Sequence, residues 1–183
     1  YIGHAQSKAH VFRDSYGYGG GTADYCVYMA AGSFSWYGGM CLGHDQYDFR
    51  MGTPDAQVTI NGVLSESSNG FVKVDGVTSA PMPISIIGSS WNSAATADNN
   101  FINVQAPGPL TLIGNKFLSS HATNYPGILM SSSKGVGFTS KGNTFLWSDK
   151  WVGDYRIYQI TASTPSEIQT DISGNVCVDN TAG

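Results

Sequence analysis

The stretch ISIIGSSW at residues 84–91 and the stretch LTLIGNKF at residues 110–117 follow one pattern. In each, a short apolar run is followed by a glycine, two polar residues and a large aromatic residue. The pattern returns in FTSKGNTF at residues 138–145, in EIQTDISGNVC at residues 167–177 and, more weakly, in VTINGV at residues 58–63. Self-similarity at a period of this length indicates a repeat architecture.

A second, shorter apolar strand lies 13 to 17 residues before each glycine, and a turn that usually carries proline separates the two strands. FINV at 101–104, APGP at 106–109 and Gly114 give one such unit, and a degenerate first copy runs from residue 25 to Gly39. The shared glycines are Gly62, Gly88, Gly114, Gly142 and Gly174, with spacings of 26, 26, 28 and 32 residues.

One unit of this kind cannot bury its apolar face alone, but stacked units can, with parallel strand pairs about 4.8 Å apart. We therefore predict an all-β fold, a right-handed parallel β-helix of about six coils, over residues 25–183. Residues 1–24 are expected to form an N-terminal cap or lead-in. No C-terminal cap is evident, which favours a fragment of a longer chain or a partner that covers the end. The alternative, a β-sandwich, predicts turn signals every 8–12 residues and no shared long period.

Stacked coils place equivalent residues in ladders. The Asn ladder that follows the glycines is interpreted as structural, because Asn tolerates left-handed backbone and its amide can bond between coils. The expected inward ladders are Ile60, Ile86, Leu112 and Ile172, and Phe71, Phe101, Ile128 and Ile157 or their immediate neighbours; the Asn ladder is Asn115, Asn143 and Asn175.

Charge and cysteine content exclude several classes of function. The formal net charge is −4 and the nine Lys and Arg residues are scattered, which disfavours nucleic acid as a partner. No apolar run approaches the roughly 18 residues of a membrane span. Cys26 and Cys41 could pair, but we favour buried free thiols for them, and Cys177 makes the count odd. No zinc-type spacing occurs, so we expect no metal and no cofactor.

The repeat resembles the pectate-lyase-like superfamily of right-handed β-helices over roughly residues 25–180. Within that superfamily, the Gly-Asn coils and the low-charge, Gly- and Ser-rich composition are similar to phage tailspike and capsule-depolymerase proteins. The resemblance implies binding, and often cleavage, of a bacterial surface polysaccharide. It also implies an extracellular or virion location and, for tailspikes, a homotrimer.

The loops after the Gly-Asn bends vary in length and collect polar and aromatic residues, and such insertions often form the binding face of a solenoid. Trp151, Tyr155 and Tyr125 are candidate platforms for sugar rings, with His121 and Arg156 as polar partners. Aromatic residues in long loops also cover apolar edges, and for Trp151 and Tyr155 the two interpretations are equally weighted. Burial is favoured for Trp91 and Trp147.

Glycoside hydrolysis requires two carboxyl groups about 5–5.5 Å apart in retaining enzymes and roughly 6.5–9.5 Å apart in inverting ones. Neighbouring coils can supply this spacing, and we predict Glu66 as the acid with Asp45 or Asp48 as its partner. Asp149 with Asp154 is a second pair. A uronate lyase would need a base and a cation or Ca²⁺, and no such cluster is evident. The remaining alternative is a non-catalytic structural or adhesive β-helix, in which the carboxylates are scattered.

Overall fold

The structure is a computed structural model of the chain. The residues that it describes are 9–53, 57–75, 83–93, 100–119, 127–132, 136–147, 157–162 and 168–179.

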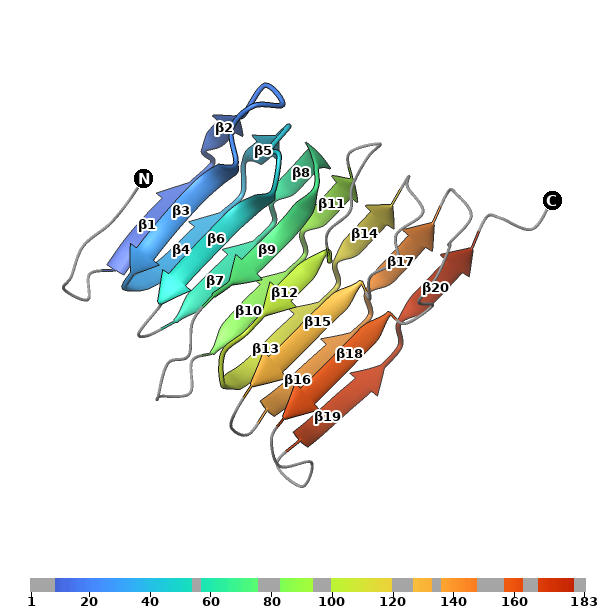
Figure 1. The fold of residues 1–183 in the computed structure, drawn as a ribbon. Coiled ribbons are helices and arrows are strands. Elements are labelled where there is room, and N and C mark those ends of the chain that lie inside the picture. Colours follow the sequence, from blue (N-terminus) through green and yellow to red (C-terminus); the bar gives the residue numbers. More distant parts are fainter. Residues whose placement is uncertain are drawn as a thin grey trace.

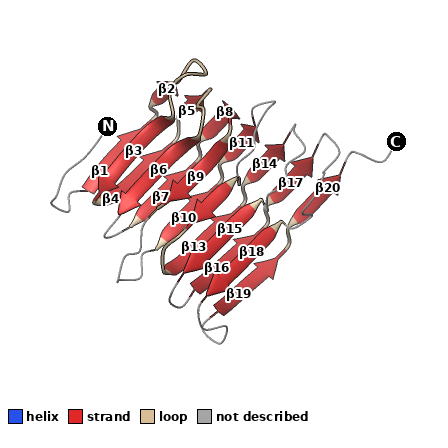
Figure 2. Cartoon of the chain, viewed as in Figure 1, coloured by secondary structure: helices blue, strands red, loops and turns tan. Residues whose placement is uncertain are grey.

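The described chain consists of strands joined by turns and bends, arranged as three parallel sheets (Figures 1 and 2). Sheet 1 contains β1 (Ala9–Arg13), β4 (Ser33–Tyr37), β7 (Val58–Asn61), β10 (Ile84–Ile87), β13 (Gly108–Ile113), β16 (Val136–Lys141) and β19 (Ile168–Ser173). Sheet 2 contains β2 (Tyr16–Tyr18), β5 (Met40–Leu42), β8 (Leu64–Ser68), β11 (Ser90–Ser93), β14 (Lys116–Ser119), β17 (Thr144–Trp147) and β20 (Val176–Asp179). Sheet 3 contains β3 (Tyr25–Ala31), β6 (Tyr47–Thr53), β9 (Gly70–Val74), β12 (Ile102–Val104), β15 (Ile128–Ser132) and β18 (Tyr158–Ala162).

Successive strands along the chain enter sheets 1, 2 and 3 in turn, so each group of three is one coil of a solenoid. Each strand pairs in parallel with the strand three places along the sequence, as β1 does with β4 and β2 with β5. The predicted fold class, an all-β parallel β-helix, is confirmed. Within the segment 1–24, β1 and β2 continue sheets 1 and 2, so the described residues of that segment lie in the outermost coil.

The bend between sheets 1 and 2 requires left-handed backbone. Gly88 and Gly114 have φ values of 57° and 63°, which residues with a Cβ adopt only at a cost. In the second coil this position belongs to Gly38 rather than to the predicted Gly39, because Gly38 N–H donates to Asn61 as Gly62 N–H donates to Ile87. In the first coil Asp14, with φ of 46°, occupies the same place.

The Asn ladder beside this bend is confirmed. The Nδ2 group of Asn115 donates to Oδ1 of Asn143 at 2.9 Å, and Nδ2 of Asn143 donates to Oδ1 of Asn175 at 3.0 Å. Each amide also binds backbone, since Oδ1 of Asn143 accepts the Asn115 N–H and its Nδ2 reaches the Leu112 carbonyl. The Asn143 side chain therefore satisfies two polar backbone groups at the bend of the preceding coil.

The core fills the tube between the three sheets. Ile60, Ile86 and Leu112 are in register and fully buried, as predicted. The next rung is Ser140, and the last is Ile172, which is in the predicted register but 48% exposed because no described coil covers it. On sheet 3 the residues that pair from coil to coil are Val72, Ile102, Ile128 and Tyr158. Ile128 is the residue predicted, whereas for Phe71, Phe101 and Ile157 the residue that follows each of them is the one in the ladder.

The prediction of free thiols at Cys26 and Cys41 is wrong, because the two residues form a disulfide with a Cα–Cα distance of 6.0 Å. Cys26 lies on β3 in the first coil and Cys41 on β5 in the second, and no local sequence pattern shows that these strands meet at a corner. Cys177 is free and exposed. The disulfide therefore ties the outermost coil to the next.

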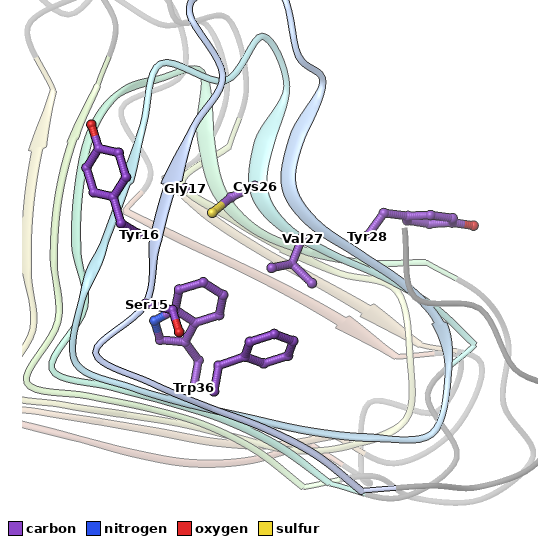
Figure 3. Close-up of a pocket in the computed structure, with 8 residues that line it drawn as sticks. Ser15, Tyr16, Gly17, Cys26, Val27, Tyr28 and Trp36 are labelled. Carbon is purple, nitrogen blue, oxygen red and sulfur yellow. The ribbon is translucent and has the colours of Figure 1, made fainter.

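The tube opens at its first coil into a cavity of about 320 Å³. In Figure 3, Cys26, Val27 and Trp36 point into the interior of the coils, whereas Tyr16 and Tyr28 point away from it. The apolar core thus reaches the end of the stack at this coil.

Replacing both Cys26 and Cys41 with Ser is expected to lower the free energy of unfolding. The bond closes a loop with a sequence separation of 15 residues, and the entropy of such a loop in the unfolded chain corresponds to about 3 kcal/mol. Urea unfolding of the double variant, compared with Cys177→Ser as the thiol control, measures the loss. Equal loss in the control would contradict the structural role of the bond.

Asn143→Ala is expected to destabilise the protein by about 3 kcal/mol, because it leaves the buried N–H of Asn115 and the carbonyl of Leu112 in the preceding coil without their partner. Asn175→Ala is the matched control, since Asn175 is only partly buried and lies in the last described coil. Thermal unfolding followed by circular dichroism should show a clearly larger loss for Asn143→Ala than for Asn175→Ala. Similar losses would mean that the ladder does not act through buried polar groups.

Candidate functional site

A polar cluster lies inside the tube, near the corner between sheets 2 and 3. His44 Nδ1 is 2.8 Å from Asp48 Oδ1, and the hydroxyl of Ser68 donates to the same oxygen at 2.6 Å. The hydroxyl of Ser65 donates to the other carboxylate oxygen, and Ser68 Oγ also accepts the His44 N–H at 3.2 Å. All four side chains are at most 2% exposed, so the cluster is closed to a polymer outside.

Burial raises the pKa of the Asp48 carboxyl above its ordinary value of 3.8, against the hydrogen bonds from His44, Ser65 and Ser68, which lower it. The ring of His44 packs against the backbone of the first coil, where a Cβ at Gly19 would lie 2.6 Å from His44 Cδ2. The cluster therefore joins three coils from within. Its arrangement is that of a satisfied buried polar network.

The predicted catalytic pair of Asp48 and Glu66 is not brought together. Ser65 points inward to Asp48, so the next residue, Glu66, points outward and is exposed, as alternation along a strand requires. Asp48 and Glu66 thus lie on opposite sides of the wall. Asp45 is exposed, and its carbonyl accepts a hydrogen bond from the side chain of Asn69.

A surface hollow of about 360 Å³ lies over sheet 2 where its strands lead into sheet 3. Tyr18, which is 71% exposed, and Glu66 supply its aromatic and charged groups. The rest of its lining consists of Gly20, Gly21, Leu42, Gly43 and Ser67. We call this site the Glu66 hollow.

The floor of the Glu66 hollow is made by backbone from three coils. Gly21 N–H donates to the Gly43 carbonyl at 2.8 Å, and Gly43 N–H donates to the Glu66 carbonyl at 2.9 Å. Ser67 has φ of 60°, and the pairing of β8 with β11 shifts register at this residue. Strained residues and β-bulges of this kind re-aim neighbouring side chains and are frequent beside functional sites.

The predicted sugar-binding residues lie outside the described residues; they are Tyr125, His121, Trp151, Tyr155 and Arg156. The prediction that Trp91 is buried is confirmed, since it is 1% exposed. Nothing is described of the Trp147 side chain, although its backbone pairs with that of Ser119.

A second group of polar side chains, which the sequence did not point to, lies on the outer face of sheet 3. Arg50 binds the carboxylate of Asp75 through Nε and the hydroxyl of Tyr25 through Nη1, and its guanidinium lies 5.1 Å from the centre of the Tyr25 ring. Lys73 Nζ is 3.4 Å from the other oxygen of Asp75. Arg50 and Lys73 are adjacent only through the register of β6 and β9, which no local pattern in the sequence shows.

Within the described ranges, no group of three or more His, Cys, Asp or Glu residues could hold a metal ion. The same part of the chain contains no helix of the length and apolar character that a membrane span requires. The chain matches no protein-family model, no curated protein and no solved structure. Functional inference therefore rests on the geometry of the fold and its two outer sites.

Asp48→Asn is expected to change how stability depends on pH. With its raised pKa, the native carboxyl keeps its proton at pH values where the unfolded chain has released it, so stability falls as pH rises above about 4. The Asn side chain does not titrate and removes this part of the slope. Urea unfolding at a series of pH values from 4 to 8 measures it, and parallel curves for the two proteins would contradict the assignment.

Proposed function

We propose that this chain is a polysaccharide-binding β-helix that holds its ligand on the outer wall. The observation that carries the proposal is the Glu66 hollow, where an exposed tyrosine and an exposed carboxylate stand over a backbone floor. Sugar rings present C–H faces that pack on an aromatic ring, and their hydroxyls donate to a carboxylate. Tyr18 and Glu66 supply both contacts, and Tyr18 adds a phenolic hydroxyl.

The outer surface of the solenoid repeats from coil to coil, and this suits a polymer rather than a small ligand. The hollow takes residues from three coils, and the segments that hold Tyr125 and Trp151 follow β14 and β17, which are in register in the same sheet. The predicted loop residues Tyr125, His121, Trp151, Tyr155 and Arg156 thus belong to the connections between sheets 2 and 3, as do Gly20 and Gly43. In the proposal these connections form one binding edge along the stack.

Binding is favoured over cleavage at the Glu66 hollow. Hydrolysis needs a second carboxyl group within about 10 Å of the first, on the same side of the wall. Glu66 is the one carboxylate among the described residues that line the hollow, and Asp48 faces the interior. A glycoside hydrolase therefore requires a second acid, which the exposed Asp45, the connections that carry Asp149 and Asp154, or another chain would supply.

The disulfide between Cys26 and Cys41 supports the proposed extracellular or virion location, because such bonds persist mainly in oxidising compartments. The homotrimer that the tailspike resemblance implies stays a proposal. An adhesive role without cleavage is the form that this proposal takes, whereas the alternative of a purely structural β-helix predicts no binding to any glycan.

The test is binding of the full chain to a panel of bacterial capsular and O-antigen polysaccharides, measured by biolayer interferometry. Tyr18→Ala is expected to weaken binding about tenfold, which is about 1.4 kcal/mol. Tyr16→Ala is the matched control, because Tyr16 is 65% exposed on the same strand but does not line the hollow. Equal losses in both variants, or binding to no glycan, would overturn the proposal.

Reducing-sugar release from the same panel separates cleavage from adhesion. Release by the wild-type chain that disappears in Glu66→Gln would make Glu66 the acid of a hydrolase. Binding without release is the result expected from the geometry.

A further inference from the structure

The outer face of sheet 3 carries two cations that share one carboxylate. Arg50 on β6 and Lys73 on β9 are paired in register on neighbouring coils, and both contact Asp75. Two positive charges and one negative charge leave a local excess of one positive charge. The chain as a whole has a formal net charge of −4, so this excess runs against the general charge.

The guanidinium of Arg50 is held in position by contacts that engage only some of its hydrogen-bond donors. Nε binds Asp75, Nη1 binds the Tyr25 hydroxyl, and the group lies 5.1 Å and 5.4 Å from the ring centres of Tyr25 and Tyr28. Arginine has five N–H donors, and in the described part of the chain these two bonds account for two of them. The same contacts thus fix the direction of the other three N–H donors of Arg50 without accepting hydrogen bonds from them.

The site is open to solvent. The Arg50 side chain is 30% exposed and the Lys73 side chain 24% exposed, so both can be reached from outside while their stems stay packed. The Lys73 ammonium lies 5.8 Å from the centre of the Tyr47 ring, which limits its movement. A fork of free guanidinium donors beside a positioned ammonium matches the geometry of an oxyanion.

We propose that Arg50 and Lys73 form an oxyanion-binding site that takes a carboxylate or sulfate group. The rings of Tyr25 and Tyr28 flank it and offer a packing surface to whatever carries the anion, which favours an acidic sugar over a free inorganic ion. That choice of ligand rests on the proposed function, whereas the oxyanion site itself does not. The site lies on sheet 3 and shares no residue with the Glu66 hollow on sheet 2.

The competing explanation is that Arg50, Lys73 and Asp75 form only a surface ion-pair network. Such pairs contribute little to stability, and a network whose charges satisfy one another has no affinity for added anions. The two explanations therefore differ in a direct titration.

The experiment follows the Nε–Hε signals of the three arginines, Arg13, Arg50 and Arg156, by NMR in the full chain labelled with ¹⁵N-arginine. Sodium glucuronate and sodium sulfate are the probes, with glucose as the neutral sugar and sodium chloride at equal ionic strength as the salt control. We expect a saturable shift of the Arg50 signal with both anions and none with glucose. Tighter binding of glucuronate would identify the acidic sugar as the ligand, and equal affinities would identify a site for oxyanions in general.

The variants Arg50→Gln and Lys73→Gln test the residues. Arg50→Gln removes one Nε–Hε signal and so assigns it to Arg50, and Lys73→Gln should weaken the saturable binding at least severalfold while the Arg50 signal still reports. Arg13→Gln is the matched control, because Arg13 also stacks on a tyrosine, 4.9 Å from the centre of the Tyr37 ring, with no second cation paired to it in the described residues. An Arg50 shift no larger than the sodium chloride control, or binding unchanged in Lys73→Gln, would overturn the site.

Failure here is distinguishable from failure of the proposed function. Polysaccharide binding that depends on Tyr18 would survive the loss of an anion site on sheet 3. Anion binding at Arg50 would equally survive a glycan panel that shows no binding at the Glu66 hollow.

Discussion

The structure depends on one constraint, which is that a strand in this fold finds its backbone partners only in the coils above and below it. The N–H of Gly88 can donate to the carbonyl of Ile113 in the next coil only if every coil returns to the same place after three strands. The left-handed glycine bend fixes the angle of one corner, and Asn115 and Asn143 fix the spacing between coils there. The core, the disulfide and both outer sites follow from that register, because each is built from residues that only stacking brings together.

The same constraint explains which parts of the fold the sequence predicts. A bend that needs positive φ selects glycine, and a buried amide ladder selects Asn. Gly-Asn pairs at 114–115, 142–143 and 174–175 therefore mark three of the coils, and Gly62 and Gly88 mark two more, regardless of the loops between coils. Contacts across a corner leave no such mark. Cys26 and Cys41 are 15 residues apart on strands of different sheets, and no local pattern shows that they meet. Arg50 and Lys73 are separated in sequence in the same way and are adjacent only through the register of β6 and β9.

Side-chain direction was the second quantity that the sequence analysis could not fix. Spacing put Asp48 and Glu66 on adjacent coils, which is correct, but a carboxylate pair also needs both side chains on one side of the wall. Ser65 turns inward to Asp48, and this places Glu66 outside. Since Ser67 interrupts the alternation of β8 with φ of 60°, the direction of its neighbours could not be counted from the strand ends.

The wall of the solenoid therefore divides the polar chemistry of this chain into two kinds. Inside, Asp48 is surrounded by His44, Ser65 and Ser68, and a charge there must be compensated by hydrogen bonds because no solvent reaches it. Outside, Glu66 and Arg50 keep solvent access and a bonding capacity that the described residues leave partly unused, which is the condition for binding a ligand. A buried group whose bonds are all made contributes to stability and specificity of register, whereas a positioned group with bonds still to make contributes to recognition. By that criterion the two surfaces proposed for recognition lie over sheets 2 and 3, and the cluster in the core holds those sheets together.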